Sequence, residues 1–169
     1  DAEEMFKQRI DDPATGPLQR DDARLSIEVL HALQRMQNQL AEFDFQPAPR
    51  DQSKLNINGV EVSVRADCLV HGATRREEQI GAAVLRMTVD DADTDAARER
   101  RREMGLYVAT LGRMHVERNI QSDRTPANRL CVSIDVQHGE VFTAPNASAR
   151  RVSDIENVCL VVSALWPAL

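Results

Sequence analysis

The dipeptide Asn58-Gly59 constrains the fold of this chain more than any other feature of the sequence. It follows the apolar-polar-apolar run 55–57 and precedes the run 60–65, in which valines alternate with polar residues. Asn and Gly tolerate the positive φ angles that the two central residues of a primed turn require, and such a turn joins antiparallel strands. We therefore predict a β-hairpin whose second strand runs to about Leu69 and is followed by a polar turn.

Three other segments repeat apolar residues every three or four positions, which is the spacing of one helical face. The predicted elements are, in order, a helix over 22–43, the hairpin over 55–69, a strand covered on both faces over 80–89, a helix over 95–120, a second hairpin over 130–144 and a closing helix over 153–165. The order α-β-β-β-α-β-β-α predicts an α/β fold with a mixed central sheet of about five strands and flanking helices.

The ends of the predicted helices carry the usual signals. Pro47 and Pro49 stop the first helix, because proline restricts its predecessor and donates no backbone hydrogen bond. Thr94 or Asp95 is a candidate N-cap for the second helix. The apolar spacing places Leu25 on the inner face of the first helix and Met104 on that of the second, whose first two turns are expected to be exposed.

The chain has 169 residues, enough for one domain that buries about two thirds of the surface of its unfolded form. Residues 1–21 combine acidic residues with Pro13, Gly16 and Pro17, a composition typical of turns. We predict a polar N-terminal extension over 1–21 and a single domain over 22–169.

The longest apolar run, over 158–169, is interrupted by Ser163 and Pro167. It falls short of the roughly 18 residues that span a bilayer, so no membrane partner is expected. Cys68, Cys131 and Cys159 are odd in number and widely spaced, which favours reduced thiols over a disulfide framework and predicts a cytoplasmic location.

The formal net charge of −6 opposes non-specific attraction to nucleic acid. The densest basic cluster is at Arg98, Arg101 and Arg102, which are the candidate nucleic-acid-binding residues. Acidic residues are interleaved with these arginines, so a solvated helix face is the alternative interpretation. Aromatic residues make up only 4% of the chain and leave few platforms on which bases stack.

Several familiar catalytic motifs are absent from the sequence, including a Gly-rich phosphate loop, a nucleophile elbow and paired Cys-x-x-Cys knuckles. Cys68 and His71 have a spacing seen at metal sites, but two ligands do not complete a four-coordinate zinc site. A core cysteine beside a loop histidine explains this pair better.

A more informative set of residues comprises Asp67, the tripeptide 84–86 (Val-Leu-Arg), and Glu103 with Tyr107. With these residues, the chain resembles the PD-(D/E)XK nuclease superfamily, specifically its RecB-type branch, over roughly 24–162. The resemblance implies a restriction-endonuclease-like fold. In that family an acid on one strand and an acid-x-lysine on the next bind Mg²⁺, which activates water for attack on a phosphodiester. A Gln-x-x-x-Tyr motif lies on the following helix.

Mapped onto this sequence, the first acid is Asp67, and the helix motif is Glu103-Met-Gly-Leu-Tyr107, with Glu in place of Gln. The acid-x-lysine motif is degraded, because Val84 occupies the position of the acid and Arg86 that of the lysine. The candidate catalytic residues are therefore Asp67, Arg86, Glu103 and Tyr107. With a single carboxylate at the motif, either no metal or only weakly bound Mg²⁺ or Mn²⁺ is expected.

Alternatives remain open for most of these residues. Glu28 and His31 on the first helix could join Asp67 as additional metal ligands, or they could be solvated side chains. Glu103 is either a migrated acid or the partner of a neighbouring arginine. Tyr107 could belong to the apolar helix face with its hydroxyl at the rim, and Asp67 could simply end a strand.

Three functions follow from these alternatives. The first is a nuclease-like domain with impaired catalysis that serves nucleic-acid binding or assembly, with DNA or a protein as partner. The second is an active nuclease that depends on Mg²⁺ or Mn²⁺ and uses a migrated acid. The third is a protein-interaction module with no role at nucleic acid.

Overall fold

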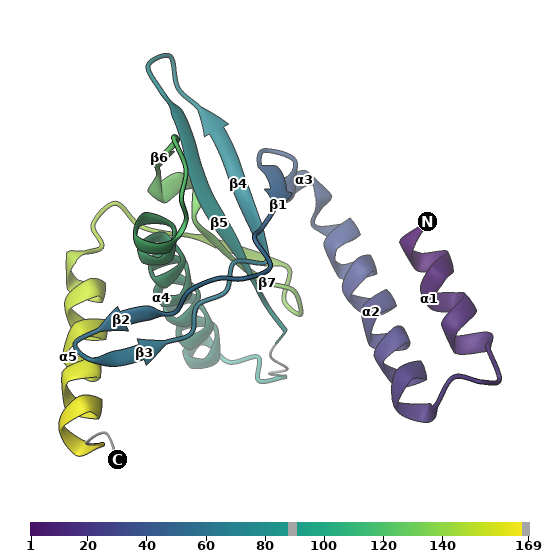
Figure 1. Ribbon diagram of the computed structural model, residues 1–169. Coiled ribbons are helices and arrows are strands. Elements are labelled where there is room, and N and C mark those ends of the chain that lie inside the picture. Colours follow the sequence, from purple (N-terminus) through teal and green to yellow (C-terminus); the bar gives the residue numbers. More distant parts are fainter. Residues whose placement is uncertain (88–90, 167–169) are drawn as a thin grey trace.

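The computed structural model describes residues 1–87 and 91–166, which form a mixed sheet flanked by helices (Figure 1). The main strands are β1 (Asp44–Pro47), β4 (Cys68–Ala73), β5 (Glu78–Arg86), β7 (Val132–Asp135) and β8 (Glu140–Thr143). They lie in the order β1-β4-β5-β7-β8, and the short β6 (Thr125–Pro126) also pairs with β5. The predicted α/β class, with a mixed sheet of about five strands and flanking helices, is confirmed.

The first three main strands form an antiparallel meander, β1 with β4 and β4 with β5. The long helix α4 (Asp95–Asn119) then crosses one face of the sheet and leads to β7, which is parallel to β5. Parallel neighbours need such a crossover, whereas β8 follows β7 antiparallel through a tight turn. Thr94 is the N-cap of α4 as predicted, since its hydroxyl accepts a hydrogen bond from the Ala97 N–H at 3.1 Å.

The predicted hairpin consists of β2 (Leu55–Ile57) and β3 (Val60–Val62). Asn58 and Gly59 have φ angles of 50° and 83°, and both are positive as a primed turn requires. The hairpin is a separate two-stranded sheet, however, and does not extend the main one.

The predicted end of the hairpin is wrong, because β3 stops at Val62 and β4 is a different strand in the main sheet. The side chain of Gln52 explains the break. It donates to the Ala66 carbonyl and accepts from the Ala66 N–H, both at 2.9 Å, so that this backbone pairs with a side chain instead of a strand. Asp67 consequently lies directly before β4.

The helix predicted over 22–43 is divided into two helices, and the second of them ends before residue 43. It forms α2 (Pro17–Arg35) and the single turn α3 (Gln37–Leu40), and β1 follows. We did not predict β1, which is an edge strand that ends at a proline, where proline is tolerated. Leu25 is 59% exposed, so its predicted place on the inner face is wrong.

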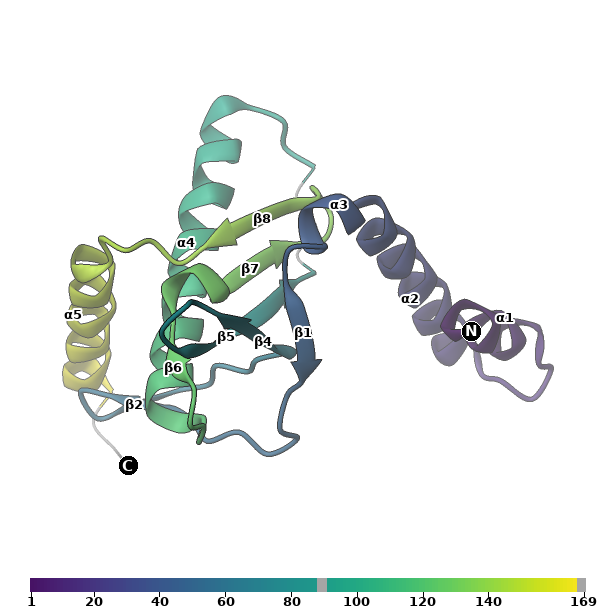
Figure 2. The ribbon, with the colours of Figure 1, turned by 90° about the horizontal axis from the view of Figure 1, so that it is seen from above.

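The prediction of a turn-rich N-terminus is also wrong for its first half, where α1 (Ala2–Asp11) forms and packs against α2. Ala23 is fully buried, but α1 itself buries none of its own residues. Seen from above, the α1–α2 pair extends away from the sheet (Figure 2). The C-terminal part of α2 packs on the sheet through Ala32, whereas α1 and the start of α2 lie away from it.

Side chains of the central strands alternate between two packed faces, as they must in a pleated sheet. On the face toward α4, the buried residues include Ile80, Ala82, Cys131, Ala109 and Val116. On the opposite face they include Met36, Val70, Ala83, Val132 and Ile134. Gly105 lets α4 approach β8 closely, because a Cβ there would lie 2.3 Å from the Phe142 ring.

The remaining elements differ from prediction in detail. The closing helix α5 (Ala149–Leu165) begins before Ser153, and a 3-10 turn (Asn128–Leu130) precedes β7. On α4, Met104 is 56% exposed whereas Arg101 is buried, which reverses the predicted faces at these two positions. The predicted strand 80–89 is observed as Glu78–Arg86, and positions 88 and 89 lie outside the described residues.

Within the described ranges, the structure contains no helix that is both long and apolar enough to cross a membrane. All three cysteines are free; Cys131 and Cys159 are buried, whereas Cys68, expected in the core, is only half-buried. Burial raises the pKa of the Cys131 thiol to about 11.

Candidate functional site

Asp67 lies directly before β4 and beside Val84 of β5, because it is hydrogen-bonded to the residues on either side of Val84. The Asp67 N–H donates to the Ala83 carbonyl at 2.9 Å. Its carboxylate Oδ2 accepts from the Leu85 N–H at 2.8 Å. The Asp67 side chain is exposed and close to β5. One of its two carboxylate oxygens already accepts a hydrogen bond from the β5 backbone.

Val84 and Arg86 share the sheet face that α4 covers, since side chains two apart in a strand point the same way. Val84 faces the middle of α4, where a Cβ on Gly112 would lie 3.8 Å from the Val84 Cγ2 atom. A valine offers no oxygen to a cation. The position beside Asp67 is thus occupied by an apolar side chain.

The Arg86 guanidinium is held in an ion pair with Asp135 on β7. Arg86 Nη2 lies 3.1 Å from Asp135 Oδ2, and the two side chains are only 13% and 6% exposed. The guanidinium also stands over the Phe142 ring, 5.5 Å from its centroid. These contacts point Arg86 along the sheet toward β7 and leave it a structural partner of Asp135.

Asp135 is shared with the turn that follows β7. Its Oδ1 accepts the His138 N–H at 3.1 Å and lies 3.0 Å from His138 Nδ1. Both carboxylate oxygens of this buried acid are therefore occupied by groups of its own domain. Hydrogen bonding on both sides is what makes a buried carboxylate tolerable.

Glu103 and Tyr107 join α4 to α5. Both Glu103 oxygens lie 3.0 Å from Arg151 Nη2, and the Tyr107 hydroxyl donates to Asp154 Oδ2 at 2.7 Å. The Arg151 guanidinium also stands 5.6 Å from the centroid of the Tyr107 ring. This confirms the alternative in which Glu103 pairs with an arginine, and the same contacts engage Tyr107 at the helix interface.

The two candidate ligands on α2 lie apart from this region. His31 Nε2 is 3.4 Å from Glu3 Oε2, so His31 faces α1 in the helix pair that extends from the sheet. Glu28 is exposed on the same helix. Neither residue is brought to Asp67.

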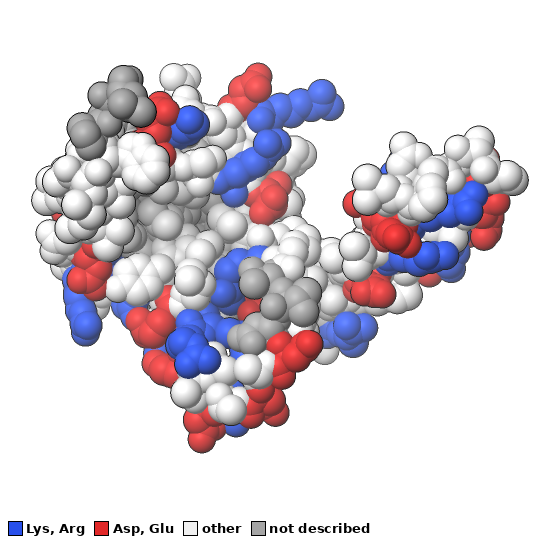
Figure 3. All heavy atoms as spheres, turned by 90° about the horizontal axis from the view of Figure 1, so that it is seen from below, with Lys and Arg blue, Asp and Glu red and all other residues white. Residues whose placement is uncertain are grey.

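The arginine cluster at the start of α4 is balanced by neighbouring groups. Arg98 is paired with Asp93 and, at 2.8 Å, with Asp95. Arg102 lies 3.2 Å from Glu99, and the buried Arg101 donates to the Ala92 carbonyl at 2.8 Å. Figure 3 shows basic and acidic side chains interleaved over one face of the molecule, which favours the interpretation as a solvated helix face.

The residues at the degraded motif do not fit a Mg²⁺ site. Magnesium sites usually take one or two carboxylates together with waters and substrate phosphates. Here Asp67 has Val84 beside it, and among the described residues no group of three or more His, Cys, Asp or Glu side chains is placed to hold a metal. Cys68 and His71 lie three apart on β4 and so point to opposite faces.

A polar pocket of about 430 Å³ beside this region did not emerge from the sequence. Arg50 and Gln52 line it from one loop, and Ser63 and Arg65 from another. Arg50 and Arg65 are exposed. Within 1–87 and 91–166 neither guanidinium forms an ion pair, in contrast to Arg98 and Arg102, although Asp51 also lines the pocket.

A buried hydrogen-bond network fixes the walls of this pocket. Gln52 Oε1 lies 2.9 Å from Nε2 of His115, which is fully buried on α4. Asn119 Nδ2 lies 3.1 Å from His115 Nδ1 and donates to the Ser53 carbonyl at 2.9 Å. Burial lowers the pKa of His115, so the neutral ring is favoured. No local signal predicts a contact between residues 63 positions apart.

A second hollow, of about 420 Å³, lies between β3, α4 and α5. Its walls are mainly apolar and include Val60, Val62, Leu111, Val158 and Val162. In Figure 3 uncharged surface extends from the α5 side into the hollowed middle of the face.

Comparison of the chain with protein-family models, curated proteins and solved structures finds no match.

Proposed function

We propose that this chain is a nuclease-like domain that binds nucleic acid without cleaving it. Its plan is similar to that of the RecB-type branch of the PD-(D/E)XK superfamily. One observation carries the proposal: Arg86, at the position that the resemblance gives to the lysine, is held by Asp135 and Phe142, while the apolar Val84 lies beside Asp67. An arginine also differs from a lysine in its fixed charge and planar geometry. These residues favour binding over metal-dependent hydrolysis.

The order of elements supports the same proposal. Asp67 precedes one strand, the Val-Leu-Arg tripeptide lies on the adjacent β5, and Glu103 and Tyr107 lie on the following helix. This is the sequence of positions that the resemblance implies.

A metal and cleavage assay tests the loss of catalysis. We expect isothermal titration to detect no Mg²⁺ or Mn²⁺ binding that depends on Asp67, and labelled single- and double-stranded DNA to remain intact with Mn²⁺. The control is Asp67→Asn, which keeps the shape of the side chain. Cleavage above that control would support the active-nuclease alternative, in which Glu103 exchanges Arg151 for a metal.

For nucleic acid, the pocket with Arg50 and Arg65 is a better candidate than the cluster on α4. Its two guanidiniums are exposed, and its loops are fixed by the network around Gln52 and His115. Preorganised cations lose less freedom when they bind phosphate. We therefore assign nucleic-acid contact to this pocket within the proposal.

Fluorescence anisotropy with a labelled oligonucleotide tests this assignment. We expect the double variant Arg50→Ala/Arg65→Ala to weaken binding and to reduce the log–log salt slope by about 2, since each phosphate contact contributes about 1. The matched control, Arg98→Ala/Arg102→Ala, removes two arginines that already have acidic partners. Equal effects of the two double variants would contradict the assignment.

A protein-interaction module without a role at nucleic acid is the second candidate. The apolar hollow beside α5 and the exposed apolar residues of that helix favour it. Under this alternative the anisotropy experiment shows no binding at any salt concentration.

A further inference from the structure

The C-terminal half of α5 exposes an apolar stripe. Val158, Val161, Val162 and Leu165 are 62%, 56%, 43% and 77% exposed, and their spacing of three and four places them on one helical face. The face that packs against the domain is a different one and contains Cys159. A stripe with this spacing is normally buried against another element, but here no described residue covers it.

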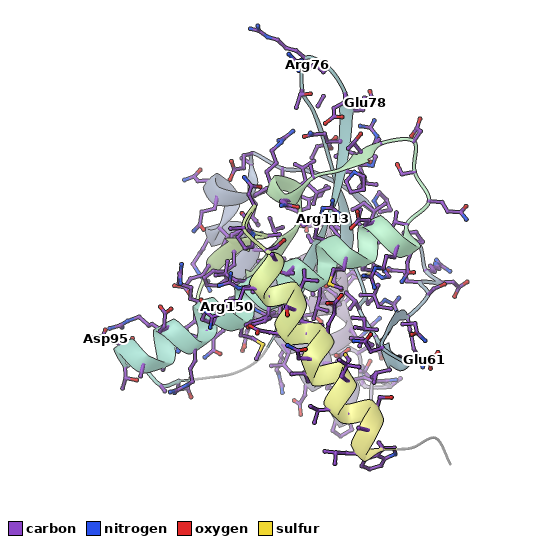
Figure 4. All side chains as sticks on the ribbon, turned by 90° about the vertical axis from the view of Figure 1, so that its left-hand side faces the viewer. Glu61, Arg76, Glu78, Asp95, Arg113 and Arg150 are labelled. Atoms are coloured by element: carbon purple, nitrogen blue, oxygen red, sulfur yellow. The ribbon has the colours of Figure 1, made fainter. Side chains whose placement is uncertain are left out.

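The stripe continues into the apolar hollow. Val158 and Val162 belong to both, and Val60 and Val62 form the opposite wall. Figure 4, viewed from the side of α5, shows this helix in front of α4 with its outer side open. The stripe and the hollow together form one surface, which we call the α5 face.

The α5 face is uncharged at its C-terminal end. The last charged residue of the chain is Glu156, and none follows in 157–169. The N-terminal half of the helix carries Arg150, Arg151 and Asp154. A partner with a charged surface would lose the hydration of its charges here without gaining a counter-charge, whereas an equally uncharged surface would not.

We infer that the α5 face binds the same face of a second copy of this chain, with the two α5 helices antiparallel about a twofold axis. The inference goes beyond the proposed function, because it concerns self-assembly and does not depend on contact with nucleic acid. In a parallel pair, the two copies of the exposed Arg150 would lie side by side. In the antiparallel pair, the charged half of each helix extends beyond the uncharged end of its partner.

The stripe is self-complementary in this arrangement. With the axis between positions 161 and 162, Val161 meets Val162 of the second copy, and Val158 meets Leu165. A twofold interface requires this reciprocity, in which residue i contacts j and j contacts i. Small β-branched residues near the axis allow close approach of the two helices.

The exposed apolar area of the α5 face is also appropriate for an interface between two copies of the chain. The four stripe residues with Trp166 expose on the order of 500 Å² of apolar area, taking about 150–250 Å² for a whole aromatic side chain and less for an aliphatic one. Monomers rarely expose contiguous apolar patches above a few hundred Å². A standard interface buries about 800 Å² per partner, which the rim of the hollow helps to supply.

Sedimentation velocity over a range of concentrations tests the inference. We expect the full chain to show a monomer–dimer equilibrium in the micromolar range, and Val161→Asp to weaken it at least tenfold. The matched control is Ser153→Asp, which adds the same charge at an exposed position of α5 outside the stripe. Circular dichroism spectra and melting curves confirm that both variants fold.

Cross-linking tests the geometry. Under mild oxidation, Val161→Cys should form a covalent dimer because position 161 lies next to the axis, whereas Ser153→Cys and the wild type should not. A monomer at every concentration, a dimer that tolerates Val161→Asp, or cross-linking at 153 and not at 161 would each overturn the inference. Oligonucleotide binding by Val161→Asp should stay unchanged, which separates this result from the fate of the proposed function.

Discussion

Arg86 and Asp135 occupy paired positions on the parallel strands β5 and β7, and their side chains meet with Arg86 Nη2 3.1 Å from Asp135 Oδ2. The pair is a cross-strand contact that holds these two strands of the sheet together.

Removing one member of this pair should destabilise the domain. We expect Asp135→Ala to lower the free energy of unfolding by about 3 kcal/mol, because it leaves a nearly buried guanidinium without its counter-charge. Urea unfolding measures the change. The double variant Arg86→Leu/Asp135→Leu should lie within about 2 kcal/mol of wild type, since it removes both charges together. Equal losses in the single and double variants would contradict a paired role.

A second carboxylate placed beside Asp67 should make the stability of the domain depend on Mn²⁺. We expect Val84→Glu to lower the unfolding temperature, because two carboxylates then lie close together on neighbouring strands. Saturating Mn²⁺ should raise it again, with each kcal/mol of binding worth about 2–4 °C in a domain of this size. Differential scanning calorimetry with and without Mn²⁺ makes the measurement.

The matched control for that experiment is Val84→Gln, which has the size of glutamate without its charge. It should show no dependence on Mn²⁺. Val84→Glu combined with Asp67→Asn should also lose the response. If Mn²⁺ does not stabilise Val84→Glu at all, Val84 does not occupy the place of the missing acid.

Tyr107 should titrate above the usual value for a phenol. Its hydroxyl donates to Asp154, which raises the pKa above 10.0 by stabilising the protonated form beside a carboxylate. The chain has a single tyrosine, so the ultraviolet absorbance of tyrosinate reports on it alone. We expect Asp154→Asn to lower this pKa toward 10.0. Identical titrations for wild type and variant would show that the hydrogen bond is not made in solution.

Local chemistry explains which parts of the fold could be predicted. Asn58-Gly59 specifies its turn and Thr94 its cap through neighbours within a few residues, and both predictions are confirmed. The strand β1 could not be found in this way, because four residues that end at Pro47 show no clear alternation and pair with β4 far along the chain.

The site was less predictable for the same reason. The sequence singles out Asp67, Val84 and Arg86, but the partner of Arg86 lies 49 residues away. The interleaved acids did indicate that Arg98 and Arg102 would be neutralised. Arg50 and Arg65 carry no local signal, because only the folded loops bring them to one pocket.

The buried network at this pocket should make stability depend on pH through His115. Burial lowers the His115 pKa below 6.5 in the folded state, whereas the unfolded chain keeps the ordinary value. Below about pH 6.5 the unfolded state therefore binds the proton first, and its population rises. This contribution to stability is fully present above that pH and is lost as the pH falls toward the folded-state pKa.

Urea unfolding at about pH 7.5 and about pH 5 tests this dependence for wild type and His115→Gln. The variant should be less stable at the higher pH, since it breaks the contacts with Gln52 and Asn119, but it should lose less stability on acidification. His31→Gln is the matched control, because His31 is much more exposed and faces α1. An unchanged pH dependence in His115→Gln would mean that another group controls the acid sensitivity of the fold.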